Sequence, residues 1–213
     1  MKKLFCKELR LVAHPTSIVF SCLGCLVLVP AYPYSVVFLF GCLAPYITFW
    51  NARETNDAWY TATLPVTKRQ SVAAKCLLTA AFQLFQLALA AVFAAVRYAL
   101  EVPNNPVGVD PTPAFFGCGL MIEAVFDFVF LTTFYKSGYR VGRAFLAASV
   151  PLAVLMAALE SCAHIPALAW MDALTAADVR RQLPILLGGM VFYPALLTAA
   201  CRVGAARFER VDL

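Results

Sequence analysis

The sequence feature that most constrains this chain is a long stretch without charge. Residues 11–51 contain no Lys, Arg, Asp or Glu. A transmembrane helix needs about 20 mostly apolar residues to cross roughly 30 Å of hydrocarbon, with a lower limit near 17. The stretch is too long for one such helix and just long enough for two, and Pro30 and Pro33 supply a break between them. The sequence therefore predicts two short membrane spans, at residues 15–31 and 34–50.

Composition extends this interpretation to all 213 residues. Hydrophobic residues make up 62% of the chain and charged residues 14%, whereas a soluble domain carries about 25% charged residues. Four more apolar runs follow the first two, at residues 72–97, 114–135, 144–160 and 183–201. We therefore expect an all-α integral membrane protein in which residues 1–213 form a single transmembrane domain of six helices.

Three polar segments flank or separate these spans. In residues 1–13, leucine and valine alternate with charged residues, a pattern typical of an amphipathic helix that lies on the membrane surface. Residues 51–71 form a polar segment between the second and third spans. Residues 160–182 mix charged and aromatic residues, and Thr175 and Asp178 have the spacing of a helix start. We expect short interfacial or re-entrant helices in this last segment.

The basic residues predict the orientation of the chain. Six spans place both termini on one side of the membrane. Of the 17 Lys and Arg residues, only Arg97, Arg180 and Arg181 lie in segments on the other side. Because Lys and Arg are enriched in cytoplasmic segments, we expect both termini and residues 51–71 in the cytoplasm, and residues 160–182 outside the cell. The basic residues stand in short clusters between apolar runs, so we expect a lipid membrane and no nucleic acid as a partner.

The segment at residues 51–71 has an internal pattern of its own. Its first half is suited to a short helix, and Leu64-Pro65 interrupts that helix. Thr67-Lys-Arg-Gln70 then has the spacing of a capping box, in which the two side chains bond to each other's backbone N–H groups. A plain turn between spans is one interpretation, but such a turn needs only a few residues. About twenty polar residues instead favour a docking surface.

The same segment resembles a known family. The pattern E-x-N-D-x-W-Y-x-x-x-L-P-V-T-K-R-x-x-V-x-x-K, from Glu54 to Lys75, is similar to the cytoplasmic segment of short, six-span membrane (permease) subunits of bacterial type-2 ABC exporters. The N-terminal KKLFCKELRLVAHP and the C-terminal RFERVDL also resemble this family. Similar short permeases export peptides, bacteriocins and toxins. One departure is Cys76, where a Tyr usually follows the Lys.

The resemblance implies a function and a set of partners. The chain would be the permease of an ATP-driven exporter in the bacterial cytoplasmic membrane, moving an amphipathic or hydrophobic substrate, such as a peptide, outward. An antimicrobial-resistance or self-immunity role is equally compatible. Two copies of a separate ATPase subunit would bind either a homodimer of this chain or a heterodimer with a similar permease.

The resemblance also implies a coupling helix that contacts the ATPase. The residues that match the family pattern there are Glu54, Asn56, Asp57, Trp59, Tyr60, Leu64, Pro65, Val66, Lys68 and Arg69. The 213 residues contain no G-x-x-x-x-G-K-[ST] phosphate loop. We therefore expect no catalytic residue, metal or cofactor in this chain, with ATP and Mg²⁺ bound by the partner ATPase.

Four polar residues inside the predicted spans form a second candidate site. Glu123 and Asp127 are four residues apart, which places both on one face of a helix. A carboxylate at mid-membrane costs about 2.5–3.5 kcal/mol on insertion scales, so a pair is expected to serve a purpose. With Gln83 and Gln86, they are candidates for lining a translocation path or binding a cationic substrate, and the two carboxyl groups are also candidates for taking up a proton. The alternatives are neutral carboxyl groups, hydrogen bonds within the helix bundle or pairing with a basic residue.

Two other function classes stay open at this point. One is an intramembrane enzyme that uses Glu123 and Asp127 as acid–base groups, although the sequence offers no accompanying nucleophile or metal cluster. The other is a membrane scaffold or sensor that binds an ATPase and transports nothing.

Overall fold

The fold is helical throughout the described part of the chain. The computed structural model describes residues 1–30, 32–138 and 140–210, and these contain no strand. The elements in chain order are α1 (Lys2–Lys7), the π-helical segment η1 (Glu8–Val12), α2 (Pro15–Cys22), the 3₁₀ helix η2 (Leu23–Leu28), α3 (Val36–Glu54), α4 (Asp57–Ala62), α5 (Lys68–Ala99), α6 (Pro113–Lys136), α7 (Val141–Cys162), the 3₁₀ helix η3 (Pro166–Met171) and α8 (Ala176–Glu209). The predicted all-α membrane fold is confirmed.

Among the described residues, five helices are long and apolar enough to cross a membrane, and these are α3, α5, α6, α7 and α8. A sixth is present if the bent pair Lys2–Val12 and Pro15–Leu28, which turns through 95°, counts as one span. The eight residues of α2 rise about 1.5 Å each, and the six residues of η2 rise about 2.0 Å each. Together the two helices are about 24 Å long. This first membrane segment is therefore short, and it ends at Leu28 rather than at residue 31.

Two helices extend beyond the apolar runs from which they were predicted. The spans expected at residues 72–97 and 183–201 lie within the longer α5 and α8, which have 32 and 34 residues. The N-terminal extensions begin at Thr67 and Thr175, which cap the two helices with their side chains. At 1.5 Å per residue these helices measure about 48 and 51 Å, well above the roughly 30 Å of a bilayer core. Their polar ends therefore project out of the hydrocarbon.

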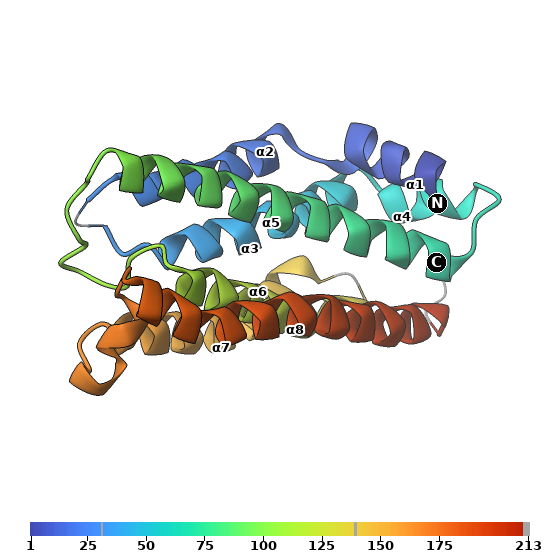
Figure 1. Ribbon diagram of the computed structural model, residues 1–213. Helices are drawn as coiled ribbons and strands as arrows, with labels where there is room; N and C mark the ends of the chain where they lie inside the picture. Colours follow the sequence, from blue (N-terminus) through green and yellow to red (C-terminus); the bar gives the residue numbers. More distant parts are fainter. Residues whose placement is uncertain (31, 139, 211–213) are drawn as a thin grey trace.

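The membrane helices form two layers (Figure 1). In one layer, α5 packs against α2, η2 and α3; in the other, α6 packs against both α7 and α8. Contacts of α5 with α8, and of α3 with α6 and α7, join the layers. The core between them is rich in aromatic rings, with Phe49 edge-on to both Phe130 and Phe134.

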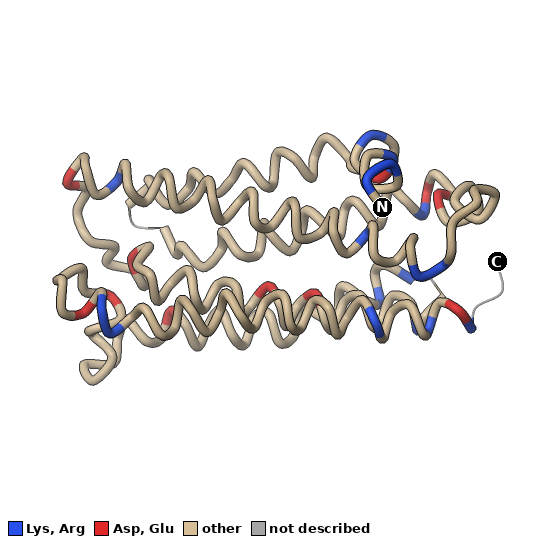
Figure 2. The backbone as a smooth tube through the Cα atoms, turned by 45° about the vertical axis from the view of Figure 1, so that its right-hand side comes forward, with Lys and Arg blue, Asp and Glu red and all other residues tan. Residues whose placement is uncertain are grey.

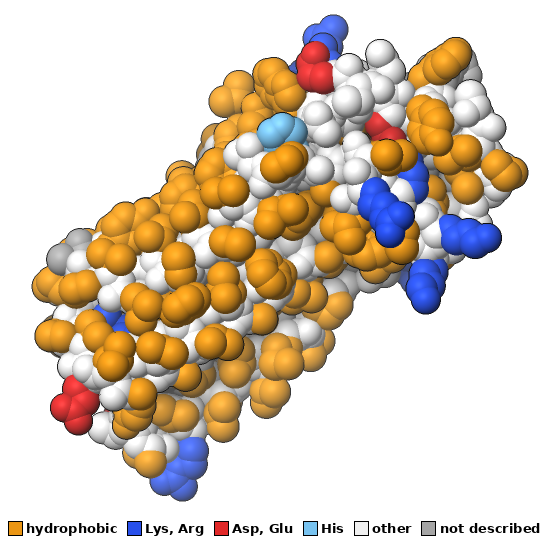
Figure 3. All heavy atoms as spheres, turned by 90° about the horizontal axis from the view of Figure 1, so that it is seen from above, with side chains coloured by type: hydrophobic (Ala, Val, Ile, Leu, Met, Phe, Trp, Pro, Cys, Tyr) orange, Lys and Arg blue, Asp and Glu red, His pale blue; other side chains and the backbone are white. Residues whose placement is uncertain are grey.

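Most charged residues lie towards the two ends of this bundle (Figure 2). We call one the basic end; it holds α1, α4 and the last turn of α8. We call the other the loop end; it holds η3 and residues 100–112, which join α5 to α6. Seen from above, hydrophobic side chains cover the middle of the molecule and charged ones lie towards the two ends (Figure 3). This belt is the surface expected of a protein that crosses a bilayer.

The backbones of α6 and α8 approach each other closely. A Cβ atom on Gly117 would lie 2.5 Å from the carbonyl oxygen of Ile185, and one on Gly189 would overlap the backbone of Gly117. Small residues at such crossings let helix backbones approach, which is a common basis of helix association in membranes. The two glycines therefore fix the spacing between α6 and α8.

Gly117→Val should consequently loosen the α6–α8 contact. We expect a loss of about 1–3 kcal/mol in stability, the usual cost of overpacking, measured as a lower unfolding temperature of the detergent-solubilised protein. Gly142→Ala on α7 is the control, because a Cβ there would meet nothing within 4 Å. Equal unfolding temperatures for the two variants would contradict this account of the contact.

Candidate functional site

The segment between α3 and α5 folds as a helix, a break and a new helix start. Asn56 begins α4 in the left-handed conformation, with φ of 52°, which Asn tolerates better than most residues. After the break at Leu64-Pro65, the N–H of Gln70 donates to Thr67 Oγ1 at 3.2 Å, and the N–H of Thr67 donates to Gln70 Oε1 at 3.0 Å. The predicted capping box is therefore confirmed.

Most of the predicted coupling residues are accessible at the basic end. On α4, Trp59 is 70% exposed and Tyr60 is 48% exposed. Leu64, Val66 and Lys68 are half-buried. The other exposed members of the set are Glu54, Asn56, Pro65 and Arg69. The face of α4 that carries the two aromatic rings is thus open to a partner.

Asp57 differs from the rest because it points inward, into a buried ion cluster. Its two oxygens accept bonds from Lys7 Nζ and Lys75 Nζ, each at 2.6 Å. The same two ammonium groups donate to Glu8, at 2.7 and 3.0 Å. Lys7 also donates to Thr61 Oγ1 at 2.8 Å. Two carboxylates and two ammonium groups therefore alternate in a neutral cluster that ties α4 to both the N-terminal segment and α5.

Asp57 and Lys7 of the ion cluster stay charged across the neutral pH range. Burial opposes the charge of Asp57, but Lys75 and Lys7 hold its pKa below the ordinary value. Its contribution to stability is complete above about pH 3.9, the pKa of an unfolded Asp, and is lost as pH falls through the lowered pKa. Burial also opposes the charge of Lys7, but bonds to Asp57 and Glu8 raise its pKa. That contribution is complete below about pH 10.4 and is lost as pH rises through the raised pKa.

Sequence reasoning found only one member of this cluster. Asp57 was among the predicted coupling residues, whereas Lys7, Glu8, Thr61 and Lys75 were not. Lys7 and Glu8 stand in the N-terminal pattern that resembles the family, and Lys75 closes the pattern after α4, so their presence was visible. Their pairing was not, because Asp57 lies 50 residues from Lys7 and 18 from Lys75.

The end of α8 also lies beside this segment. Arg69 Nε donates to Glu209 Oε1 at 2.7 Å, and Lys68 Nζ lies 5.4 Å from the ring centre of Phe208. An exposed ion pair adds little to stability, but this one shows that the start of α5 lies close to the last turn of α8. All three segments that carry the family resemblance therefore meet at the basic end, apart from residues 211–213, which lie outside the described chain.

Lys75→Met should release α4 from the N-terminal segment. Removing one partner of a buried ion pair costs about 3–5 kcal/mol because it leaves the other charge uncompensated. We expect faster hydrogen–deuterium exchange at the backbone amides of residues 57–62. Arg143→Met is the control, since Arg143 is an exposed basic residue at the start of α7. Unchanged exchange in the Lys75 variant would show that the ion cluster does not hold α4.

The four polar residues of the spans form a second cluster in the middle of the bundle. Gln83 Nε2 donates to Asp127 Oδ1 at 3.0 Å, and Gln86 Nε2 donates to the carbonyl oxygen of Val37 at 2.8 Å. Tyr193 of α8, which sequence reasoning missed, donates to Gln83 Oε1 at 2.6 Å. Gln83 and Asp127 are thus joined directly, and Gln86 is bonded to the backbone of α3. Glu123, the fourth predicted residue, makes no hydrogen bond to a described residue.

Several oxygens of this cluster have no donor. Within the described residues, both oxygens of Glu123, Oδ2 of Asp127 and Oε1 of Gln86 are buried without a hydrogen-bond partner. Gly41 makes room for two of them, because a Cβ on Gly41 would overlap the carboxyl group of Glu123 and lie 2.5 Å from Gln86 Oε1. We call Glu123, Asp127, Gln83 and Gln86 the mid-membrane cluster.

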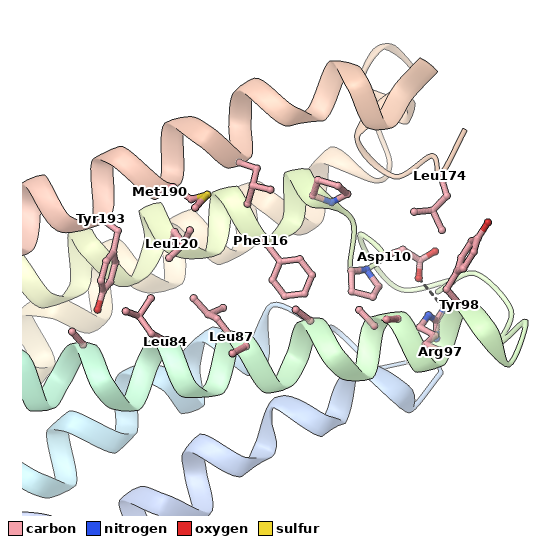
Figure 4. A pocket seen from close by; sticks show the side chains of 18 of the residues that line it. Leu84, Leu87, Arg97, Tyr98, Asp110, Phe116, Leu120, Leu174, Met190 and Tyr193 are labelled. Atoms are coloured by element: carbon pink, nitrogen blue, oxygen red, sulfur yellow. Dashed lines mark hydrogen bonds and ion pairs between the residues drawn. The ribbon is translucent and has the colours of Figure 1, made fainter. Parts of the chain in front are cut away.

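A groove of about 1320 Å³ lies beside the mid-membrane cluster, between α5, α6 and α8. Its walls are mostly apolar and include Leu84, Leu87 and Leu120. Arg97 and Asp110, paired at 2.8 Å, stand at its loop end, and Tyr193 lies well away from them along the groove (Figure 4). The mid-membrane cluster does not itself line the groove. Tyr193 lines the groove and donates to Gln83 of the cluster.

The fold and these sites define a multi-pass membrane protein with an exposed helix at one end and an apolar groove within the bundle. The family model described as "ABC-2 family transporter protein" matches residues 3–196. The chain therefore belongs to the ABC-2 transporter family, and it is the membrane permease component of a type-2 ABC transporter. No curated protein and no solved structure matches it.

Membership settles the class of function. A permease of this family is a transport component and is generally not catalytic, and it belongs to a transporter system with an ATPase partner. The choice between a transport protein and an intramembrane enzyme is thereby made in favour of transport.

Proposed function

We propose that this chain is the permease of an exporter that moves an amphipathic or hydrophobic substrate, such as a peptide, out of a bacterial cell. Two copies of a separate ATPase bind ATP and Mg²⁺ and drive a pair of permeases, which is either a homodimer or a heterodimer with a similar chain. The observation that carries this proposal is α4, with its exposed aromatic rings and its buried ion cluster.

Charge supports the orientation that the proposal requires. Lys and Arg gather at the basic end, together with α1, α4 and the last turn of α8 (Figure 2). Because cytoplasmic segments of membrane proteins are rich in Lys and Arg, the basic end faces the cytoplasm, where an ATPase can reach it. Both termini are then cytoplasmic, in the bacterial cytoplasmic membrane.

The ion cluster supports a route for mechanical coupling. An ATPase that binds Trp59 and Tyr60 would displace α4 when it changes conformation. Asp57 of the same helix is bonded to Lys75 of α5 and to Lys7 of the N-terminal segment. The bonded groups would move as one body, which is a common way in which a small displacement reaches a distant part of a protein. One wall of the groove is α5, so this motion acts on the groove directly.

The groove supports an amphipathic substrate of considerable size. Its volume of about 1320 Å³ exceeds the range of about 300–1,000 Å³ that is usual for pockets holding drug-sized ligands. Its leucines suit apolar side chains, and the mid-membrane cluster behind Tyr193 offers polar groups. Glu123, Asp127, Gln83 and Gln86 therefore contribute to the translocation path once Tyr193 moves aside.

The orientation is tested by labelling single cysteines with a membrane-impermeant maleimide. In a background without the eight native cysteines, restored Cys6, which is exposed on α1, should react in inverted membrane vesicles and not in intact cells. Leu100→Cys, at an exposed position of the loop end, should react in intact cells. The opposite pattern would reverse the proposed topology.

The coupling surface is tested with two matched tryptophan substitutions. Trp59→Ala should weaken co-purification of the ATPase by at least tenfold and reduce ATP-driven substrate export, because it removes the largest exposed side chain of α4. Trp170→Ala, the same substitution on η3 at the loop end, should change neither. Unchanged ATPase binding by the Trp59 variant would refute the coupling surface. ATPase binding by the unmodified protein without any substrate movement would instead indicate a scaffold or sensor.

A further inference from the structure

The mid-membrane cluster is rich in acceptors and poor in donors. Glu123, Asp127 and Gln86 are all fully buried. Four of their oxygens have no donor among the described residues. Acidic positions occur midway along the bundle, whereas basic positions occur only towards its two ends (Figure 2). The cluster is therefore not neutralised by a Lys or Arg of the described chain, in contrast to the ion cluster at the basic end.

A cationic nitrogen group supplies the N–H donors that these oxygens lack. An ammonium group carries three N–H donors and a guanidinium group five, and neither accepts hydrogen bonds. Hydrogen bonds between such groups and carboxylates are among the strongest in proteins. An anion would add further acceptors to the cluster, and an alcohol brings a single donor, whereas four acceptor oxygens stand without one among the described residues.

Tyr193 connects this cluster to the groove. The side chain lines the groove and is 4% exposed. Its hydroxyl donates to Gln83, which in turn donates to Asp127. If Tyr193 rotates away, one hydrogen bond is broken, and Gln83 and Asp127, which follow it in the chain of hydrogen bonds, become reachable from the apolar groove. An apolar body in the groove and a cationic head at the carboxyl groups can then be held at the same time.

We propose that the groove and the mid-membrane cluster together bind a cationic amphiphile. Its ammonium or guanidinium group bonds to Glu123, Asp127 and Gln86, its apolar part lies against Leu84 and Leu87, and Tyr193 is the gate between the two compartments. This inference rests on the proposed function, because it names the substrate class of the same path. It is carried by charge complementarity between the uncompensated acceptors and the ligand.

The test measures ligand binding to the full chain in lipid nanodiscs, without an ATPase and with empty nanodiscs subtracted. The probe is dodecylammonium, compared with dodecanol and dodecanoate, which have the same chain length but a neutral or an anionic head. We expect saturable binding of dodecylammonium alone. Asp127→Asn and Glu123→Gln, which nearly preserve side-chain volume, should each weaken it at least tenfold. Asp178→Asn, the same kind of change at the loop end, should leave it unaltered.

Two further variants separate the parts of the site. Leu84→Trp should fill the groove and abolish binding while leaving both carboxyl groups in place, so the test does not depend on the folding of the acidic variants. Tyr193→Phe should accelerate binding, because the gate loses its hydrogen bond to Gln83. A faster on-rate would support the gate, and an unchanged on-rate would refute it.

The other outcomes overturn the inference. Equal binding of dodecanol and dodecylammonium would reduce the groove to an apolar site without charge selection. If Leu84→Trp changed the oligomeric state and not dodecylammonium binding, the groove would be a contact with a second copy of the chain. Neither result bears on ATPase binding by Trp59 variants, so failure here and failure of the proposed coupling are distinguishable.

Discussion

The buried ion cluster of Lys7, Glu8, Asp57 and Lys75 is the interaction on which the basic end of the protein depends. Each ammonium group contacts both carboxylates, at 2.6–3.0 Å. Charges can be buried at such a site only in balanced sets, because a single unpaired member would pay its full desolvation cost. The balance requires α1, η1, α4 and α5 to hold fixed positions relative to one another. The short helix α4, with six residues, is too short to be stable alone and depends on this anchoring.

The two polar clusters of the protein contrast in how they are neutralised. At the basic end, opposite charges from distant parts of the chain compensate one another. In the middle of the bundle, Glu123 and Asp127 face Gln83 and Gln86, which are neutral and supply few donors. The first arrangement makes a rigid connection. The second leaves unused acceptors beside an apolar groove, which is the arrangement suited to a ligand that brings its own charge.

Much of the fold could be predicted, for reasons visible in particular residues. The absence of charge from residues 11–51 required membrane helices, and the prolines at 30 and 33 placed their break. The spacing of Thr67 and Gln70 predicted a capping box at the start of α5, because that motif depends only on residues close together in the sequence. The structure contains the capping box. The ends of α5 and α8 were less predictable. Hydropathy shows where a helix leaves the hydrocarbon and does not show where the helix ends. Both α5 and α8 continue as polar helices beyond the end of their apolar runs.

The candidate sites, like the fold, have features that local sequence patterns predict and features that depend on how the helices pack. The sequence alone determined the membrane-spanning class, the segregation of basic residues and the exposed Trp59–Tyr60 segment, because these follow from composition and from patterns within a few residues. Only the tertiary structure decided that Asp57 turns inward to Lys7 and Lys75, that Tyr193 reaches Gln83, and that a groove opens between α5, α6 and α8. Those contacts join residues 18 to 110 positions apart. Such pairings depend on how helices cross, and local sequence patterns carry no information about that geometry.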